Sequence, residues 1–208
     1  MDYIKRNLES VISQVTKEYP VVLVTGPRQV GKTTMLQKLM QGTNRSYVSL
    51  DDLNERNLAK TDPELFLQLH KPPILIDEVQ YAPELFTYIK IQVDKNHDAG
   101  AFWLTGSQVF KLMKGVQESL AGRVAVLSLT SLSQAELSEG RIEPFTVDLE
   151  ALSIRSTERK VADVEDIFER IYQGSMPAIV SGANSNNQIF YSSYLSTYIE
   201  RDARELSD

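Results

Sequence analysis

Two glycines, a lysine and a threonine stand at the spacing of a phosphate-binding loop. Gly26 is followed, after four residues, by the run Gly31–Thr33, which gives the pattern G-x-x-x-x-G-K-T. Glycines let a backbone wrap so closely that its N–H groups point at phosphate oxygens. A lysine at this position reaches the β- and γ-phosphates of a nucleotide, and the threonine hydroxyl is a ligand for Mg²⁺. The pattern predicts a nucleotide-binding loop (P-loop) made of Gly26, Pro27, Arg28, Gln29, Val30, Gly31, Lys32, Thr33 and Thr34.

A pair of acidic residues, Asp77 and Glu78, follows the apolar run 73–76. Mg²⁺ keeps much of its water in proteins, so an aspartate at a strand end suits it as a ligand, largely through water. We therefore expect Asp77 to hold Mg²⁺ together with Thr33, and Glu78 to polarise the attacking water. A base beside the terminal phosphate favours hydrolysis over transfer to an acceptor. The alternative is that the pair only caps the helix that follows.

A third polar group follows the apolar run 101–105. A side chain at the tip of a strand beside the P-loop strand can touch the γ-phosphate or position the water. Ser107 is the first candidate for this sensor role, and Thr105 and Gln108 are alternatives. The competing interpretation is a loop serine that caps a turn.

Two arginines are candidate cations for the transition state, Arg123 and Arg201. Arg123 could instead be a surface arginine paired with a nearby carboxylate, and Arg201 could form ordinary pairs on a helix surface. Asp51 and Asp52 could approach the nucleotide, but capping of a helix is the preferred interpretation. The sequence leaves open whether the Arg28 side chain contacts phosphate or the chain behind it.

The elements that must position these residues alternate between two patterns. Short apolar runs rich in β-branched residues predict buried strands, and apolar residues three and four apart predict helices between them. Such alternation is typical of an α/β fold with a parallel sheet covered by helices on both faces. The predicted strands cover residues 21–25, 46–50, 73–76, 101–105 and 124–129, and the predicted helices 3–19, 32–40, 63–70, 83–96, 164–172 and 188–206.

The composition and the hydrophobic periodicity of the chain change after residue 138. Residues 139–163 are rich in charge and weakly periodic, which predicts a linker or peripheral segment between a P-loop core over 1–138 and a small helical, lid-like region over 164–208. The final residues lie inside a helical pattern. We therefore expect a further C-terminal domain to be missing from this sequence.

The composition limits the classes of function. The 208 residues carry a net charge of −6 and no cysteine, which excludes disulfides and thiolate metal sites. No apolar run of about 18 residues and no secretory signal occur, so we expect a cytoplasmic protein without a membrane span. The acidity gives no indication of duplex DNA as a partner, although a local basic patch at Lys111, Lys114 and Arg123 leaves nucleic acid open.

Together these motifs resemble a widespread prokaryotic group of AAA+-type ATP-binding proteins, in which the ATPase module precedes a second C-terminal domain. The runs Leu-Thr-Gly-Ser and Leu-Ala-Gly-Arg, in this order, are the more particular signals. One departure is Gly174-Ser175 before Met176-Pro177, where the family usually has paired glycines. The matching segments are 26–34, 50–52, 75–80, 83–86, 104–108, 119–123 and 198–202.

The resemblance implies a five-stranded parallel core in which the sensor strand separates the Asp-Glu strand from the P-loop strand. It also implies ATP and Mg²⁺ as ligands, Ser107 as the first sensor, and Arg123 and Arg201 as finger or second sensor. No guanine-reading Asn-Lys-x-Asp motif occurs, which favours ATP over GTP.

The sequence thus predicts a Mg²⁺-dependent ATP hydrolase that couples its nucleotide state to a C-terminal module or a partner. The alternatives are an interaction switch with little hydrolysis and a nucleic-acid-associated motor or loader. A small-molecule kinase is disfavoured because no acceptor site is visible. Besides the nucleotide, a second copy of the chain or another protein is the expected partner.

Overall fold

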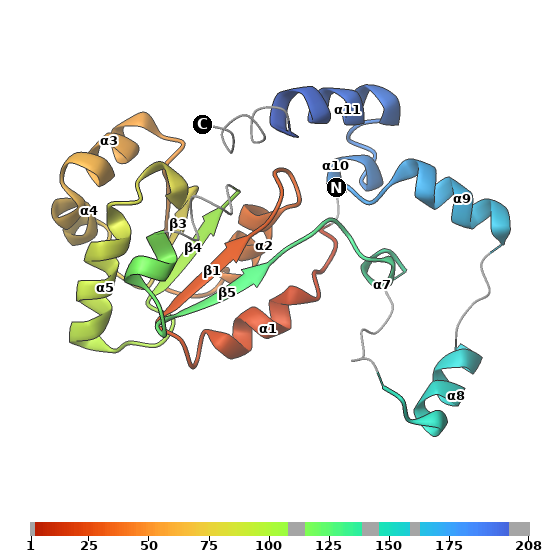
Figure 1. Cartoon of the computed structure of the whole chain (residues 1–208), viewed down its shortest axis with the longest axis horizontal. Helices are drawn as coiled ribbons and strands as arrows, with labels where there is room; N and C mark the ends of the chain where they lie inside the picture. Colours follow the sequence, from red (N-terminus) through yellow and green to blue (C-terminus); the bar gives the residue numbers. More distant parts are fainter. Residues whose placement is uncertain (1–2, 108–114, 139–145, 159–162, 200–208) are drawn as a thin grey trace.

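A computed structural model describes residues 3–107, 115–138, 146–158 and 163–199. Its centre is one sheet of five parallel strands in the order β2-β3-β4-β1-β5 (Figure 1). This confirms the predicted α/β fold, with the sensor strand β4 between the P-loop strand β1 and the Asp-Glu strand β3. The strands are β1 (Val21–Thr25), β2 (Ser46–Ser49), β3 (Ile74–Asp77), β4 (Phe102–Gly106) and β5 (Val124–Ser128).

Helices connect the strands and continue beyond the sheet. The first group is α1 (Leu8–Val15), α2 (Lys32–Leu39), α3 (Leu53–Thr61), α4 (Pro63–Leu69), the 3₁₀ turn η1 (Val79–Tyr81) and α5 (Leu85–Asn96). The second group is α7 (Gln134–Leu137), α8 (Leu149–Glu158), α9 (Val164–Gln173), α10 (Pro177–Val180), α11 (Asn187–Tyr194) and the π-helical turn η2 (Leu195–Ile199).

Alternate side chains of the strands build two apolar layers. Val21 and Leu23 of β1 pack in one cluster with helices α3, α4 and α5. Val22 and Val24 pack in the other with α1 and α2. Figure 1 shows α3–α5 and α1 on opposite sides of the sheet. Because parallel strands are buried on both faces, the predicted helical cover is required by the sheet itself.

Local signals fix several helix starts. Asp52 caps α3 by accepting hydrogen bonds from the N–H groups of Asn54 and Glu55. Asp62 caps α4 in the same way, with Pro63 at the first position. The interpretation of Asp52 as a helix cap is thereby confirmed, since its carboxylate is engaged at the start of α3.

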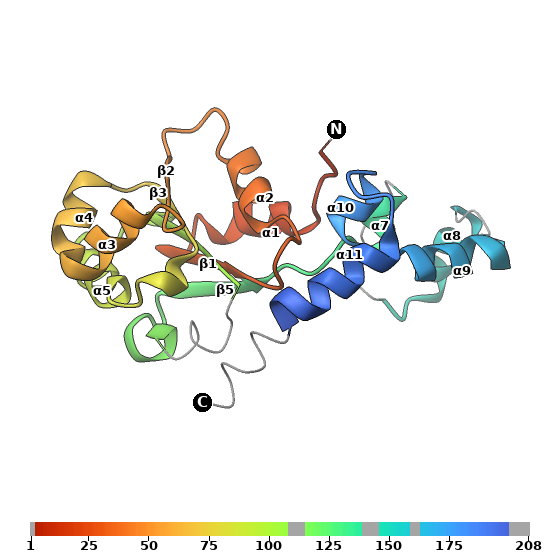
Figure 2. The same ribbon diagram turned by 90° about the horizontal axis from the view of Figure 1, so that it is seen from above.

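The helices after residue 138 are placed differently. Figure 2 shows α8 and α9 extending away from the sheet, while α10 and α11 return to it. Met176 and Ile179 of the α10 region join the second apolar cluster, and the rings of α11 pack on that cluster. The segment predicted as a linker contains the regular helix α8, and the division into domains stays a prediction. In the described part of the chain, no helix combines the length and hydropathy needed to cross a bilayer.

Candidate functional site

Both glycines of the P-loop are required by the backbone. Gly26 follows β1 with a φ of +137°, and a Cβ placed on it would lie 2.0 Å from the carbonyl oxygen of Leu129. Gly31 has a φ of +90° and occupies the N-cap of α2, so helix α2 begins directly at Lys32. The loop therefore closes over the positive end of a helix dipole, the arrangement that binds phosphate.

Lys32 is held inside the loop by two carbonyl groups. Its Nζ donates to the oxygen of Gly26 at 2.9 Å and to that of Pro27 at 2.7 Å. Burial lowers the pKa of Lys32; the negative charges of Glu78 and Asp77 oppose this shift, and the positive charge of Arg28 adds to it. A bound phosphate group would favour the ammonium form, because an adjacent anion stabilises a buried cation.

Asp77 lies at the end of β3 and accepts hydrogen bonds from three hydroxyl groups. Its Oδ1 accepts from Thr33 at 2.7 Å and also from Thr105, and its Oδ2 accepts from Tyr47 at 3.3 Å. The residue is only 5% exposed. Thr33 Oγ1 and Asp77 Oδ1 thus meet at the N-terminus of α2, and they are hard oxygen donors of the kind that Mg²⁺ binds. The residues present fit the ion that the sequence predicts.

Glu78 connects the acidic pair to the sensor strand. Its backbone has a φ of +56°, uncommon for a residue with a side chain, and its N–H donates to Thr105 Oγ1 at 3.1 Å. Its carboxylate accepts from Gln80 and, at 3.4 Å, from Ser107. Glu78 makes no capping hydrogen bond to the turn that follows. The side chains of the pair therefore face the P-loop and β4 instead of capping a helix.

Three residues of this network were not the first candidates from the sequence. Thr105 was the alternative to Ser107, and it is fully buried between Asp77 and the Glu78 N–H. Tyr47 and Gln80 were not predicted. Burial and the negative charge of Asp77 raise the pKa of Tyr47, so its hydroxyl remains a donor. No local signal in the sequence marked Tyr47, because only the pairing of β2 with β3 brings it to Asp77.

Arg123 lies at the other end of the sheet. Its carbonyl accepts from the N–H of Val21, the first residue of β1, whereas the P-loop follows the last. Five strand residues separate the two ends by roughly 16 Å at about 3.3 Å per residue. The guanidinium pairs with Asp94, with Nη2 to Oδ2 at 2.9 Å. This hydrogen bond lowers the pKa of Asp94 and raises that of Arg123. The fold does not bring Arg123 to the P-loop of its own chain.

Four residues proposed from the sequence lie outside the described part of the chain: Gln108, Lys111, Lys114 and Arg201.

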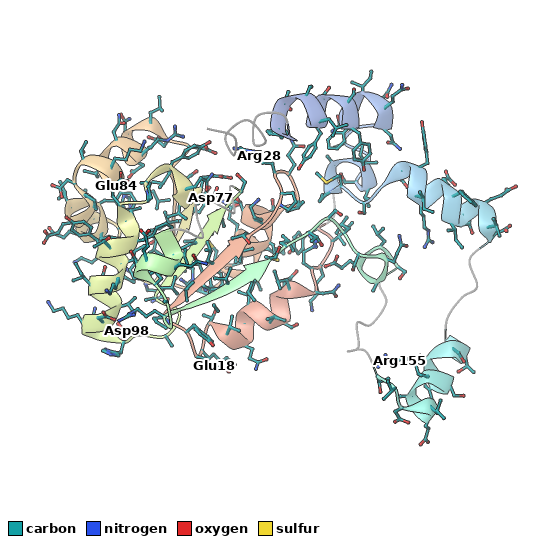
Figure 3. All side chains as sticks on the ribbon, in the orientation of Figure 1. Glu18, Arg28, Asp77, Glu84, Asp98 and Arg155 are labelled. Atoms are coloured by element: carbon teal, nitrogen blue, oxygen red, sulfur yellow. The ribbon has the colours of Figure 1, made fainter. Side chains whose placement is uncertain are left out.

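The tip of the P-loop meets the C-terminal helices. Tyr194 donates from its hydroxyl to the carbonyl oxygen of Arg28 at 3.2 Å. Gln29 Nε2 donates to the hydroxyl of Tyr198 at 3.0 Å, and the Arg28 guanidinium lies 5.4 Å from the centre of the Tyr198 ring. Figure 3 shows Arg28 on the loop beside this helix and Asp77 at the strand end. A cavity of about 450 Å³ is lined by Gln29, by residues 183–186 and by side chains of α11 and η2.

Comparison with known proteins agrees with this geometry. A family model described as an AAA domain matches residues 18–138. The uncharacterized proteins Mb2031c of Mycobacterium bovis and Rv2008c of Mycobacterium tuberculosis are each 28% identical over 205 residues, or 97% of this chain and 40% of the relative. The chain thus spans two fifths of the length of these relatives.

Among solved structures, the Walker-type ATPase paby2304 of Pyrococcus abyssi has a TM-score of 0.58 and 17% identity, and the match covers 99% of this chain and 75% of that one. A likeness at this identity concerns the fold.

Proposed function

The chain belongs to the AAA domain family, which places it among the nucleotide-binding P-loop ATPases, and we propose that it hydrolyses ATP with the help of Mg²⁺. The observation that carries the proposal is the contact between Glu78 and Ser107, next to Asp77 bonded to Thr33. A nucleotide-holding loop needs only the phosphate contacts. A partly buried acid that follows β3, held by a polar side chain at the end of β4, suits activation of water.

In the proposed reaction, a water oxygen bonds to the γ-phosphorus and the bond from this phosphorus to the β–γ bridging oxygen breaks, which yields ADP and inorganic phosphate. Glu78 accepts the proton of the attacking water. Lys32 and the N–H groups of the loop bind the phosphate oxygens. Thr33 and Asp77 would hold Mg²⁺, which supplies positive charge to the phosphate oxygens when bound.

Several features support hydrolysis over transfer to an acceptor. Thr105 fixes the backbone of Glu78 and the carboxylate of Asp77 through the same hydroxyl group. Ser107 lies on the Glu78 side of this network and is only 8% exposed. A base held at this place acts on water without a further substrate. We propose Ser107 as a group that positions the water or senses the γ-phosphate.

We propose that Arg123 acts on the nucleotide of a second copy of the chain. Its position at the far end of the sheet excludes its own P-loop, while its partner Asp94 is on the surface of α5. An exposed ion pair of this kind contributes little to stability, so the arginine can exchange partners at low cost. The isolated chain would then bind ATP and turn it over slowly. The interaction switch with little hydrolysis is the second candidate for the same reason.

Turnover measured at increasing protein concentration separates these two functions. We expect tight MgATP binding, lost at least about tenfold in Lys32→Ala, and a rate per molecule that rises with concentration. Arg123→Ala should abolish the rise and leave nucleotide binding unchanged. A flat, negligible rate with intact binding would favour the switch, and absence of nucleotide binding would contradict the proposal.

The task beyond hydrolysis follows from the C-terminal contacts. We propose that the nucleotide state moves the helices of residues 164–199, because α11 and η2 touch the P-loop directly. Coupling through that region to a further domain or a protein partner is part of the proposal, and so is a cytoplasmic location. The acidic net charge of −6 gives nucleic acid no support as a partner.

A further inference from the structure

The guanidinium of Arg28 has buried donors with no acceptor. Its Nε and Nη2 atoms are inaccessible to solvent, and none of the described residues accepts a hydrogen bond from them. A buried N–H group without a partner is unfavourable, more so when it is charged. Guanidinium donors match the paired oxygens of phosphate and carboxylate groups. Arg28 is therefore arranged for an anion that is not part of the described chain.

The location of Arg28 indicates which anion that is. It stands two residues after Gly26, inside the P-loop. Lys32 Nζ donates to the carbonyl oxygen of Pro27, the residue before Arg28, so both cations belong to the same loop. Two neighbouring cations repel each other, and an anion between them relieves the repulsion and satisfies the Arg28 donors. A phosphate group of the nucleotide meets both requirements.

The other side of Arg28 is held by the C-terminal helix. The Arg28 guanidinium lies within cation–π distance of the Tyr198 ring, and the Arg28 carbonyl oxygen accepts a hydrogen bond from the Tyr194 hydroxyl. The neighbouring Gln29 donates to the Tyr198 hydroxyl. Tyr198 belongs to η2, a π-helical turn, and such turns occur often at functional sites. One arginine thus joins the phosphate-binding loop to the helix that follows α11.

We propose that Arg28 binds the terminal phosphate of the nucleoside triphosphate and, through Tyr198, transmits the presence of that phosphate to α11 and η2. The inference rests on the proposed function in that a nucleotide must occupy the P-loop. With ADP the Arg28 donors lack their acceptor, and with ATP they gain one. The two nucleotides therefore interact differently with the same loop, which is what a shift between two conformations requires.

Affinities of Arg28 variants for a non-hydrolysable ATP analogue and for ADP test the phosphate contact. For Arg28→Ala we expect roughly 10- to 100-fold weaker binding of the analogue, with ADP affinity changed less than about threefold, because charged hydrogen bonds to the terminal phosphate are lost. The analogue affinity of Arg28→Lys, which keeps the charge, should lie between those of the wild type and Arg28→Ala. Arg170→Ala on the exposed helix α9 is the matched control.

Three outcomes decide this contact. Equal weakening of both nucleotides, or of neither, would overturn the inference while the wild type still binds ATP. Thermal unfolding of both Arg28 variants shows whether each of them is folded. If Arg28→Ala is not folded, the nucleotide affinities of Arg28→Lys alone decide whether the contact exists. A wild type that binds no nucleotide would overturn the proposed function and the inference together.

Amide hydrogen exchange across residues 187–199 tests the transmission. In the wild type, exchange should be slower with the ATP analogue than with ADP, because Arg28 then contacts both the terminal phosphate and the Tyr198 ring. Tyr198→Leu should remove this difference and keep most of the analogue affinity, whereas Tyr88→Leu on α5 should keep both. A difference that persists in Tyr198→Leu would overturn the role given to the ring.

Discussion

The sheet core and the pair of helices α8 and α9 use apolar side chains in opposite ways. In the core, Phe66 and Phe102 are fully buried between helices and strands. In α9, Phe168 is 67% and Ile171 is 70% exposed, although the helix has a clear apolar face. The predicted nucleotide and metal ligands in the described part of the chain lie on the strand ends and the P-loop of the sheet core. The candidate site is thus built on the sheet core, and no described residue of α8 or α9 contacts it.

Helix α11 and η2 form an intermediate case. They lie beyond the exposed helices in the chain, yet they return to the second apolar cluster and to the tip of the P-loop. Contact with a functional loop, and not position in the sequence, distinguishes them from α8 and α9. The comparison predicts that core changes alter folding, that α11 changes alter nucleotide response, and that α9 changes alter neither.

The largest expected effect is on folding stability, and it is seen when the same change, phenylalanine to alanine, is made in the core and in α9. Phe66→Ala should lower the free energy of unfolding by about 3–5 kcal/mol, because it leaves a cavity in the core. Phe168→Ala in α9 should stay within about 0.5 kcal/mol, because its ring is already exposed. Denaturant unfolding of both variants provides the measurement. Similar losses in the two would remove the distinction between the regions.

A smaller loss of folding stability is expected at the ion pair that joins the N-terminal segment to α7. Glu136 accepts from Arg6 Nε at 3.0 Å, and the two side chains are 5% and 4% exposed. Glu136→Gln should lower the free energy of unfolding by about 1–3 kcal/mol near neutral pH. Chemical denaturation from pH 7 down to pH 3 checks this value and its pH dependence.

The pH dependence has a definite sign. Burial alone would raise the pKa of Glu136, but hydrogen bonds from the N–H groups of Ser133 and Asn7 and from Arg6 outweigh it and lower the pKa below 4.5. The stabilisation is therefore complete above the unfolded-state pKa and disappears as the pH falls through the lower folded-state value. The difference between wild type and Glu136→Gln should shrink below about pH 4.5. A difference that grows in acid would contradict the role of the carboxylate.

The sequence predicted, for a physical reason, that several residues of the candidate site would lie at one edge of the sheet. Apolar runs that end in glycine or acid mark strand ends, and the carboxyl ends of parallel strands share one edge of the sheet. Asp77 and Ser107 could therefore be assigned to one site before their contacts were known. Arg123 was predicted as a candidate cation for the transition state, but it precedes β5 whereas the P-loop follows β1, so the fold places it at the other end of the sheet. The resemblance, and not the spacing, supplied the strand order.

Other contacts had no local signal. Arg28 and Tyr198 are far apart in the sequence, and only the return of α11 to the core brings them together. Tyr47 resembles any residue of a half-exposed strand until β2 pairs with β3. The charged segment 139–163 was predicted as a linker because it is rich in charge and weakly periodic, and of the residues of α8 whose burial is described, 149–157, none is buried. Packing over long range, which propensity does not encode, decides such cases.

The smallest predicted effect tests the proposed Mg²⁺ site in the core. Tyr47→Phe removes the hydroxyl that holds Asp77 Oδ2. The Mg²⁺ concentration needed for half-maximal MgATP binding should rise roughly two- to tenfold, since one hydrogen bond contributes about 0.5–1.5 kcal/mol. ATP affinity without Mg²⁺ should not change, and Tyr88→Phe should behave as wild type. A change in metal-free binding would assign Tyr47 to the nucleotide instead.

The central claim is that Glu78 makes this chain a hydrolase and not only a nucleotide holder. Single-turnover hydrolysis of bound MgATP tests it in wild type and Glu78→Gln, with Glu84→Gln on the exposed surface as the matched control. We expect the Glu78→Gln rate to fall at least about 100-fold with MgATP affinity within about threefold, and the control to be unchanged. A Glu78→Gln rate equal to that of the wild type would contradict the assignment of Glu78 as the base.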